Sequence, residues 1–184
     1  MLRCLDIVFS VIGLVVGFPV LVVIYLVGMF DTGAPLFRQE RVGRNLRPFV
    51  LVKFRTMTLD TASVASHLAS TASITRVGGF LRKTKLDELP QLWNVLRGDM
   101  SLVGPRPNLF NQEELIKVRN ELGVYKVRPG ITGLAQVSDI DMSTPDLLAR
   151  TDAKMIAEMS LKNYFVFIFR TVSGAGSGDR VVNK

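Results

Sequence analysis

The stretch IVFSVIGLVVGFPVLVVIYLVGMF, residues Ile7 to Phe30, contains no charged side chain. At a rise of about 1.5 Å per residue, a helix of this length covers the ~30 Å hydrocarbon core of a bilayer. A secretory signal peptide is the competing interpretation, but the apolar run exceeds a usual signal core and no small-residue cleavage pattern follows it. The sequence therefore predicts that residues 1–30 hold the chain in a membrane.

Pro19 lies in the middle of this segment and predicts a break there. Proline lacks a backbone N–H and disfavours a helical conformation at the preceding residue, here Phe18. Each half would be about 18 Å long, enough to reach mid-bilayer and turn back. Positive charges at Arg3 and from Arg38 onward place the C-terminal part in the cytoplasm. The sequence leaves open whether the helix spans the membrane with a kink or enters and leaves by the same face.

The following segment, residues 31–172, has the length of one compact domain. Leu36–Glu40 and Phe49–Phe54 read as strands, and Gly43 and Asn45 mark their connection, so we expect a β-hairpin. The remainder should be mainly helical. The expected fold class is α+β, with a membrane helix in front of a compact cytoplasmic domain that contains a small β-hairpin.

Two helices are indicated by apolar spacing and by residues typical of helix ends. The first has Asp87 as N-cap, Glu88 just inside and Gly98 as C-terminal cap, with apolar positions at Leu89, Leu92, Trp93 and Leu96. The second begins with the capping-box pattern Ser143–Asp146, has Pro145 near its start, and runs to about Met159.

Three other segments have weaker signals. Residues 58–74 are small, polar and aperiodic, which predicts a loop or a poorly ordered lid. Tyr164–Phe169 contains four aromatic residues and belongs either to the core or to the bilayer interface. The glycine-rich and serine-rich end, residues 173–184, is expected to be a disordered tail.

Composition excludes several kinds of site. Cys4 is the single cysteine, so the chain forms no internal disulfide and no thiolate metal site. His67 is the single histidine, so no zinc site is expected, and we interpret it as a surface loop residue. The formal net charge is +7, with basic residues concentrated between residues 38 and 85. Such a patch attracts phosphates, nucleic acid or acidic lipid head groups.

An acidic pair, Asp87 and Glu88, lies inside this basic region. Acidic residues at a helix start are usually capping residues, and the pair alone needs no other explanation. However, Arg106 in VGPRP and Arg128 in VRPGITG are flanked by proline and glycine, which limit where these phosphate-matching side chains can point. A carboxylate in this cationic setting should stay ionised, as a nucleophile or a Mg²⁺ ligand requires. The combination indicates phosphoryl chemistry.

Four ordered blocks carry a family resemblance: GAPLFRQERVGR (33–44), KFRTM (53–57), LRKTKLDELPQLWNVLRGDMSLVGPRP (81–107) and VRPGITGLAQV (127–137). With them the sequence resembles the bacterial sugar transferases, small monotopic phosphoglycosyl transferases. The resemblance implies transfer of a sugar 1-phosphate from a UDP-sugar to undecaprenyl phosphate, with release of UMP, as the first membrane step of surface glycan assembly.

The resemblance also implies residue roles. Asp87 would be the nucleophile that forms a covalent phosphosugar intermediate, and Glu88 would hold Mg²⁺ with it or orient the acceptor. The implied phosphate-binding residues are Lys53, Arg55, Arg82, Arg106 and Arg128. A re-entrant helix broken at Phe18 and Pro19 is favoured. The expected location is the bacterial inner membrane with the catalytic domain on the cytoplasmic face, with membrane lipid as a partner and no nucleic acid.

Two other functions are compatible with parts of the sequence. A membrane-anchored protein could bind acidic lipid through its basic patch, and a scaffold could lend its membrane helix to a complex without catalysis. The first explains the arginines of residues 38–55 but not the acidic pair, and the intact candidate motifs argue against the second. The transferred sugar is left open, because Ser138–Met142 departs from the Asn-Gly-Arg-Asn-like stretch of many relatives.

Overall fold

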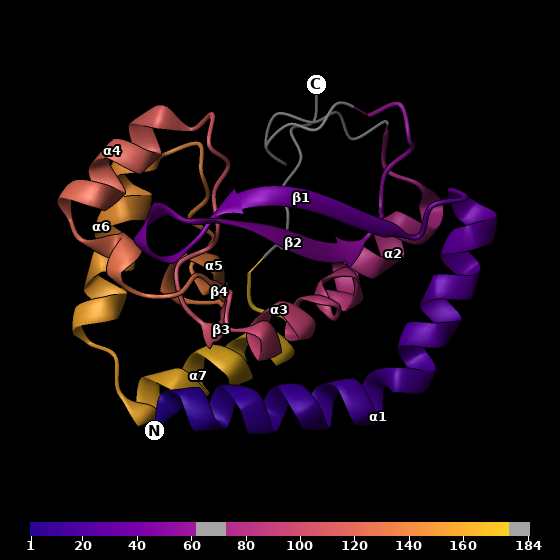
Figure 1. Cartoon of the computed structure of the whole chain (residues 1–184), viewed down its shortest axis with the longest axis horizontal. Helices are drawn as coiled ribbons and strands as arrows, with labels where there is room; N and C mark the ends of the chain where they lie inside the picture. Colours follow the sequence, from indigo (N-terminus) through magenta and orange to yellow (C-terminus); the bar gives the residue numbers. More distant parts are fainter. Residues whose placement is uncertain (62–72, 177–184) are drawn as a thin grey trace.

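The computed structural model describes residues 1–61 and 73–176. Most of the lid predicted at 58–74, including His67, lies outside the described residues, and so does most of the tail predicted at 173–184. The described part is a mainly helical α+β structure with a long apolar helix at its N-terminus, as the sequence predicts (Figure 1).

The N-terminal segment forms a single helix, α1 (Leu2–Asp31), that contains Pro19. Figure 1 shows α1 running along one edge of the molecule and then turning sharply toward α2 (Arg76–Thr84). Proline removes one backbone donor and crowds the preceding turn, so it bends a helix whose other hydrogen bonds persist. The break predicted at Phe18 and Pro19 is therefore a bend within a continuous helix.

Most of the α1 surface is not covered by protein. Among the described residues, α1 is the one helix whose length and hydropathy would let it cross a membrane. Its exposed side chains include Val15, Val16 and Phe18, which lie close to Pro19 in the sequence. A continuous apolar surface of this kind is unfavourable in water. Lipid is the environment that it fits.

The strands of the described part pair as two small sheets. β1 (Leu36–Val42) pairs antiparallel with β2 (Pro48–Phe54), which confirms the predicted hairpin, and their connection contains the 3-10 turn η1 (Arg44–Leu46). β3 (Ser101–Val103) and β4 (Gly130–Thr132) form a parallel pair. The sequence did not predict this second pair, because strands of three residues are too short to show an alternating pattern.

Helices cover the C-terminal half of the chain, namely α4 (Glu113–Glu121), η5 (Val124–Lys126), α5 (Leu134–Val137), α6 (Pro145–Ala157) and α7 (Leu161–Val172). The helix predicted after residue 143 is confirmed as α6. Its predicted capping box is wrong, because the N-cap Thr144 makes no side-chain capping bond and Asp146 accepts a hydrogen bond from Arg150 instead.

The aromatic residues of α7 lie on two different faces. Tyr164 and Phe167 are buried, whereas Phe169 is 72% exposed. Phe165 packs edge-on against Phe9 of α1, with ring centroids 6.0 Å apart, and Figure 1 shows the two helices side by side. One face of this segment therefore belongs to the core, as one of the two alternatives predicts, and its other face lies beside the apolar surface of α1, where a position at the bilayer interface stays a prediction.

Helix α3 (Gln91–Arg97) begins later than predicted. The chain enters it through a separate 3-10 turn, η4 (Leu86–Glu88), and then Pro90. Proline has no N–H to donate, so the α-helical bonding pattern starts only after it. Asp87 therefore lies in η4 and is not the N-cap of α3. Gly98 ends the helix with a φ of +91°, as predicted.

One face of α3 packs on α1 and another faces the hairpin. A Cβ on Gly13 of α1 would lie 2.8 Å from Leu92 Cδ1, so the small residue permits close contact. On the buried face, Asn94 Oδ1 accepts from the Val52 N–H, and its Nδ2 donates to the Val50 carbonyl. Asn94 thus satisfies the outer edge of β2 as a neighbouring strand would.

A buried carboxylate attaches the start of α1 to the domain. Asp6 is 3% exposed. It accepts hydrogen bonds from the Ser101 hydroxyl at 2.8 Å, the Leu102 N–H at 3.0 Å and the Tyr164 hydroxyl at 2.9 Å. Burial and the adjacent Asp6 carboxylate raise the pKa of the Tyr164 phenol, so it stays a donor near neutral pH. Asp6 thereby joins α1 to both β3 and α7.

The second limb of α1 is attached at a different place. Ile24 packs with Phe54 of β2 and Leu81 of α2. At the end of the helix, Asp31 Oδ2 accepts a hydrogen bond of 2.7 Å from the Thr75 hydroxyl. Both limbs of the bent helix are therefore held against the same domain.

Replacing Asp6 tests the first attachment. Asp6→Ala leaves one buried and two partly buried donors without their acceptor and should lower the free energy of unfolding by about 3 kcal/mol. The measurement is urea unfolding of the full chain in detergent, followed by fluorescence of the single tryptophan. Asp60→Ala, which removes an exposed carboxylate, should change the midpoint little. Equal losses in the two variants would contradict the anchoring role.

Candidate active site

The acidic pair lies in η4, between α2 and α3. Lys85 shapes the turn with a φ of +58°, a conformation uncommon outside glycine. Its ammonium donates to the Ala175 carbonyl, beyond α7, and burial lowers the pKa of this lysine. Asp87 is 3% exposed, whereas Glu88 lines a small cavity. The turn thus presents one carboxylate to the cavity and keeps the other covered.

The cavity beside Glu88 has a volume of about 20 Å³. This is room for about one water molecule, so a larger ligand would require it to open. Three cations and one carboxylate line it, together with apolar and amide groups; the residues are Arg41, Leu51, Lys53, Glu88, Gln91, Arg106, Pro107, Gly130 and Ile131. The excess of positive charge favours an anionic ligand.

Arg106 is held in this cavity from two sides. Its Nη2 lies 3.2 Å from Glu88 Oε1. From behind, Arg119 Nη1 donates to the Arg106 carbonyl and to Asn108 Oδ1, each at 2.9 Å. Arg119 is itself held by Asp152, at 2.6 Å between Nη2 and Oδ2, with both side chains fully buried. The Arg119–Asp152 pair therefore positions the backbone that carries Arg106.

Two glycines bring the blocks around Arg106 and Arg128 together. A Cβ on Gly130 would lie 2.0 Å from the Gly104 nitrogen, so only glycine fits this approach. The Gly104 N–H donates to the Thr132 carbonyl, and the Gly130 N–H donates to the Pro105 carbonyl, each at 2.8 Å. The VGPRP and RPGIT segments, separate cationic elements in the sequence, are neighbours through their backbones.

The structure brings only some of the predicted phosphate-binding residues to Glu88. Lys53, on β2, lines the cavity with Arg106. Arg55 donates through Nε to the Ala34 carbonyl at 2.9 Å, at the base of the hairpin. Arg82 donates through Nε to the Thr56 hydroxyl at 2.8 Å, just beyond β2.

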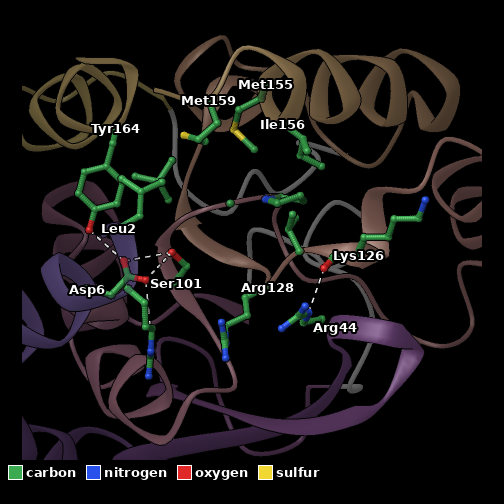
Figure 2. A pocket seen from close by; sticks show the side chains of 15 residues that line it. Leu2, Asp6, Arg44, Ser101, Lys126, Arg128, Met155, Ile156, Met159 and Tyr164 are labelled. Atoms are coloured by element: carbon green, nitrogen blue, oxygen red, sulfur yellow. Dashed lines mark hydrogen bonds and ion pairs between the residues drawn. The ribbon is translucent and has the colours of Figure 1, made fainter. Parts of the chain in front are cut away.

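Arg128 lies in a different cavity. Its Nε donates to the Gly98 carbonyl at 2.7 Å, and its side chain lines a space shared with Arg3 and Arg44 (Figure 2). The Glu88 cavity is instead lined by Gly130, two residues further along the chain. Arg128 is thus separated from the other predicted residues.

Comparison with known proteins identifies the family. The family model described as bacterial sugar transferase matches residues 1–177. The chain belongs to the bacterial sugar transferase family. The four ordered blocks that carry the resemblance all lie inside the matched region.

Several relatives of the chain have names that state a function. The chain is 36% identical over 188 residues to the UDP-galactose-lipid carrier transferase of Erwinia amylovora. This alignment covers 92% of the chain and 39% of that protein. The chain is 38% identical over 180 residues to the UDP-glucose:undecaprenyl-phosphate glucose-1-phosphate transferase of Caulobacter vibrioides, covering 92% and 67%. The chain is 40% identical over 133 residues to the putative undecaprenyl-phosphate N-acetylgalactosaminyl 1-phosphate transferase of Bacillus subtilis. This alignment covers 70% of the chain and 72% of that protein.

The relatives differ in length. The chain spans about two fifths of the length of several curated relatives that it matches, including those of Erwinia amylovora and Salmonella typhimurium. The aligned part includes the acidic pair, since 92% of this chain is aligned with each relative and the pair lies near the middle of the chain. Most of the chain is therefore shared with these proteins.

The carboxylates of η4 can be compared with the known modes of Mg²⁺ binding. Within residues 1–61 and 73–176, no group of three or more His, Cys, Asp and Glu side chains could hold a metal ion. Mg²⁺ commonly takes one or two protein carboxylates and completes its shell with water and substrate phosphate oxygens. Glu88, the carboxylate that lines the cavity, fits this mode as one protein ligand, and the covered Asp87 would join it only after the cavity opens. In this mode the metal arrives with a phosphate substrate.

The sequence analysis missed two residues of this site. Arg41 lines the Glu88 cavity, and its Nη1 donates to the Pro107 carbonyl at 3.2 Å. The sequence contained a signal for Arg41, since this residue lies within the family block GAPLFRQERVGR. Arg119 had none, because it lies on a helix that was not predicted and its partner Asp152 is 33 residues away.

The two Arg–Asp pairs of α6 provide a matched test. Arg119→Gln leaves the Asp152 carboxylate buried without its cation and should lower the free energy of unfolding by about 3–5 kcal/mol. Arg150→Gln removes the exposed pair with Asp146 and should leave the urea midpoint nearly unchanged. Tryptophan fluorescence in detergent provides the measurement. Similar midpoints for the two variants would contradict the structural role of Arg119.

Proposed function

We propose that this chain transfers a sugar 1-phosphate from a UDP-sugar to undecaprenyl phosphate and releases UMP, as the first membrane step of surface glycan assembly. The observation that carries the proposal is the turn η4, where Glu88 lines a cavity with Lys53 and Arg106 and directly follows the covered Asp87, in a domain attached to an apolar helix. The relatives named for undecaprenyl-phosphate sugar transfer support the same reaction.

In the proposed first step, a carboxylate oxygen of Asp87 attacks the β-phosphorus of the UDP-sugar. The new O–P bond forms as the bond to the oxygen bridging the two phosphates breaks, and UMP leaves with that electron pair. Sugar 1-phosphate is left on Asp87 as an acyl phosphate. Because Asp87 is 3% exposed and the cavity beside the neighbouring Glu88 is small, this step requires the cavity to open.

In the second step, a phosphate oxygen of undecaprenyl phosphate attacks the same phosphorus. The bond between this phosphorus and Asp87 breaks, which regenerates the carboxylate and yields an undecaprenyl diphosphate sugar. Dividing the transfer in this way lets UMP leave before the bulky lipid acceptor reacts. The two large substrates therefore need not occupy the site together.

The cations around η4 would neutralise the diphosphate. Lys53 and Arg106 are directly beside Glu88, and Arg41 completes the set. Arg82 and Arg55, at the end of β2, would add positive potential at longer range. Attack of an anion on an anionic phosphate is slow without such neutralisation, so these side chains matter more in the transition state than in binding.

Asp87 and Glu88 would hold Mg²⁺ when the substrate is present. The metal, when bound, would supply further charge neutralisation on the diphosphate oxygens. Arg106 fixes the position of the Glu88 carboxylate through their 3.2 Å pair. Glu88 is therefore oriented toward the cavity before the substrate arrives.

An apolar groove offers a place for the acceptor lipid. It has a volume of about 750 Å³ and lies between α1, the β1–β2 hairpin and α3. Phe18 and Trp93 contribute apolar walls, and Arg38 and Arg97 also line it. Pro90, another lining residue, is two positions from Glu88 in the chain. We infer that the polyprenyl chain lies here, with its phosphate directed to η4.

The bent helix supports a re-entrant anchor. Both limbs of α1 are attached to the same domain, through Asp6 at one end and Asp31 at the other. A helix that crossed the bilayer would place its ends on opposite faces. We therefore propose that α1 enters and leaves by the cytoplasmic face of the bacterial inner membrane, with the catalytic domain on that side.

The nucleophile can be tested by a near-isosteric change. Asp87→Asn should reduce UMP release from UDP-sugars in the presence of undecaprenyl phosphate by about 10³-fold or more. Wild-type protein with UDP-sugar alone should form a phosphosugar adduct on the Asp87 peptide, detected by mass spectrometry. Asp146→Asn, an exposed change on α6, should retain turnover. Wild-type turnover in Asp87→Asn would eliminate the proposed mechanism.

The metal requirement has its own test. Removal of divalent cations with EDTA should abolish UMP release, and added Mg²⁺ should restore it. Glu88→Gln should raise the Mg²⁺ concentration needed for half-maximal turnover by about tenfold, since one carboxylate ligand is lost. Mg²⁺ titrations of both proteins measure this. Full activity in EDTA would show that the carboxylates act without a metal.

A further inference from the structure

Another cavity, of about 280 Å³, is lined by no residue of η4, and Figure 2 shows the side chains around it. Its walls come from the first turns of α1, β3 and the chain after it, the segment before β4, and residues of α6 and α7. Pro105 lines this cavity, whereas Arg106 and Pro107 line the Glu88 cavity. The VGPRP segment is thus a wall common to both, and none of the proposed reacting groups is in the larger one.

Three arginines from separate parts of the chain meet at this cavity. Arg3 comes from α1, Arg44 from η1 and Arg128 from the segment before β4. Burial lowers the pKa of Arg128, and the nearby charges of Arg3 and Arg44 lower it further. Figure 2 shows the side chains of Arg44 and Arg128 pointing into the same region, whereas the Lys126 ammonium points away.

Arg44 and Arg128 are each anchored through Nε, which leaves the two Nη nitrogens of each guanidinium available to a ligand. Arg44 Nε donates to the Lys126 carbonyl at 2.9 Å, and Arg128 Nε donates to the Gly98 carbonyl at 2.7 Å. Within the described part of the chain, the Nη atoms of both side chains make no hydrogen bond. A guanidinium fixed at Nε and open at its Nη atoms is pre-oriented for a bidentate oxyanion ligand.

The cavity's own negative charge does not balance these cations. Asp6 is the one acidic residue among the described residues that line it. Its carboxylate already accepts from Ser101, Leu102 and Tyr164, and Arg3 Nη1 lies 3.8 Å away. Arg3 in turn donates to backbone carbonyls of α3. The charges of Arg44 and Arg128 are therefore left without a carboxylate partner at the cavity.

We propose that this cavity binds a phosphate group between the forks of Arg44 and Arg128. The group comes either from the head group of an anionic lipid or from a free phosphate compound. Apolar side chains on the same lining, Leu2, Ile156 and Met159, and the start of the membrane helix would suit the adjoining part of a lipid. The ligand would bind whether or not Asp87 is a nucleophile.

A ligand here would stabilise the folded state, because it binds Arg44 and Arg128, which come from two parts of the chain that separate on unfolding. The full chain is placed in phosphatidylcholine nanodiscs, and its thermal midpoint is measured by tryptophan fluorescence. One arm replaces a tenth of the lipid with phosphatidylglycerol. The other adds inorganic phosphate against chloride of equal ionic strength. A rise of a few degrees is expected in at least one arm.

The two arms identify the source of the phosphate group. A rise with phosphatidylglycerol alone supports a lipid head group, and a rise with inorganic phosphate supports a free compound. No rise in either arm would overturn the proposal.

Single variants separate this cavity from general charge effects. Arg44→Gln should abolish the rise, whereas Arg47→Gln should keep it, because Arg47 is an exposed residue three positions away that does not line the cavity. Arg106→Gln should also keep it, which distinguishes this cavity from that of Glu88. Equal loss in the Arg44 and Arg47 variants, or a rise that survives Arg44→Gln, would overturn the proposal.

Two further variants distinguish loss of ligand binding from loss of folding stability. Arg128→Gln should abolish the rise too, but it also frees the Gly98 carbonyl and could lower the starting midpoint. Arg44→Lys keeps the charge and loses the fork, so it should retain less than half of the rise with an unchanged starting midpoint. Full retention in Arg44→Lys would contradict bidentate binding.

Discussion

The buried carboxylate of Asp6 is the interaction on which the arrangement of this protein depends. A charge at the start of an apolar helix is costly in lipid and needs partners in protein. Asp6 finds them in β3 and α7, through Ser101, Leu102 and Tyr164. β3 continues directly into VGPRP, so the contact that fixes the membrane helix also fixes the strand that leads to Arg106. The distance and the orientation of the membrane helix relative to the site around Arg106 are therefore fixed.

The VGPRP segment then divides the interior of the domain. On one side Arg106 meets Glu88 and Lys53, and on the other Pro105 meets the arginine-lined cavity. Its backbone is held by Gly130 across the parallel strands and by the buried Arg119 from behind. A displacement of this one segment would change both cavities, which explains why its two prolines and its glycine are all placed at contacts.

Rules based on a few neighbouring residues correctly predicted several elements of the fold. The hairpin, the end of α3 at Gly98 and the helix beginning at Pro145 follow from turn residues and caps, because these depend on conformational preferences of a few neighbouring residues. The same rules misplaced Asp87, because Pro90 delays the α-helix and leaves η4 as a separate turn. They also gave no sign of the Arg119–Asp152 pair, whose members meet only after two helices pack.

The sequence by itself determined that the chain has an apolar anchor bent at a proline, a basic domain and an acidic pair set among arginines. These properties depend on composition, on spacing and on the family blocks. Only the tertiary structure decided which cations share a cavity with Glu88 and which lie elsewhere, since Lys53 and Arg106 are brought together there while Arg128 is directed to Arg44. The physical reason is that a side chain's direction follows from backbone contacts, such as that of Gly104 with Gly130, between residues distant in the sequence.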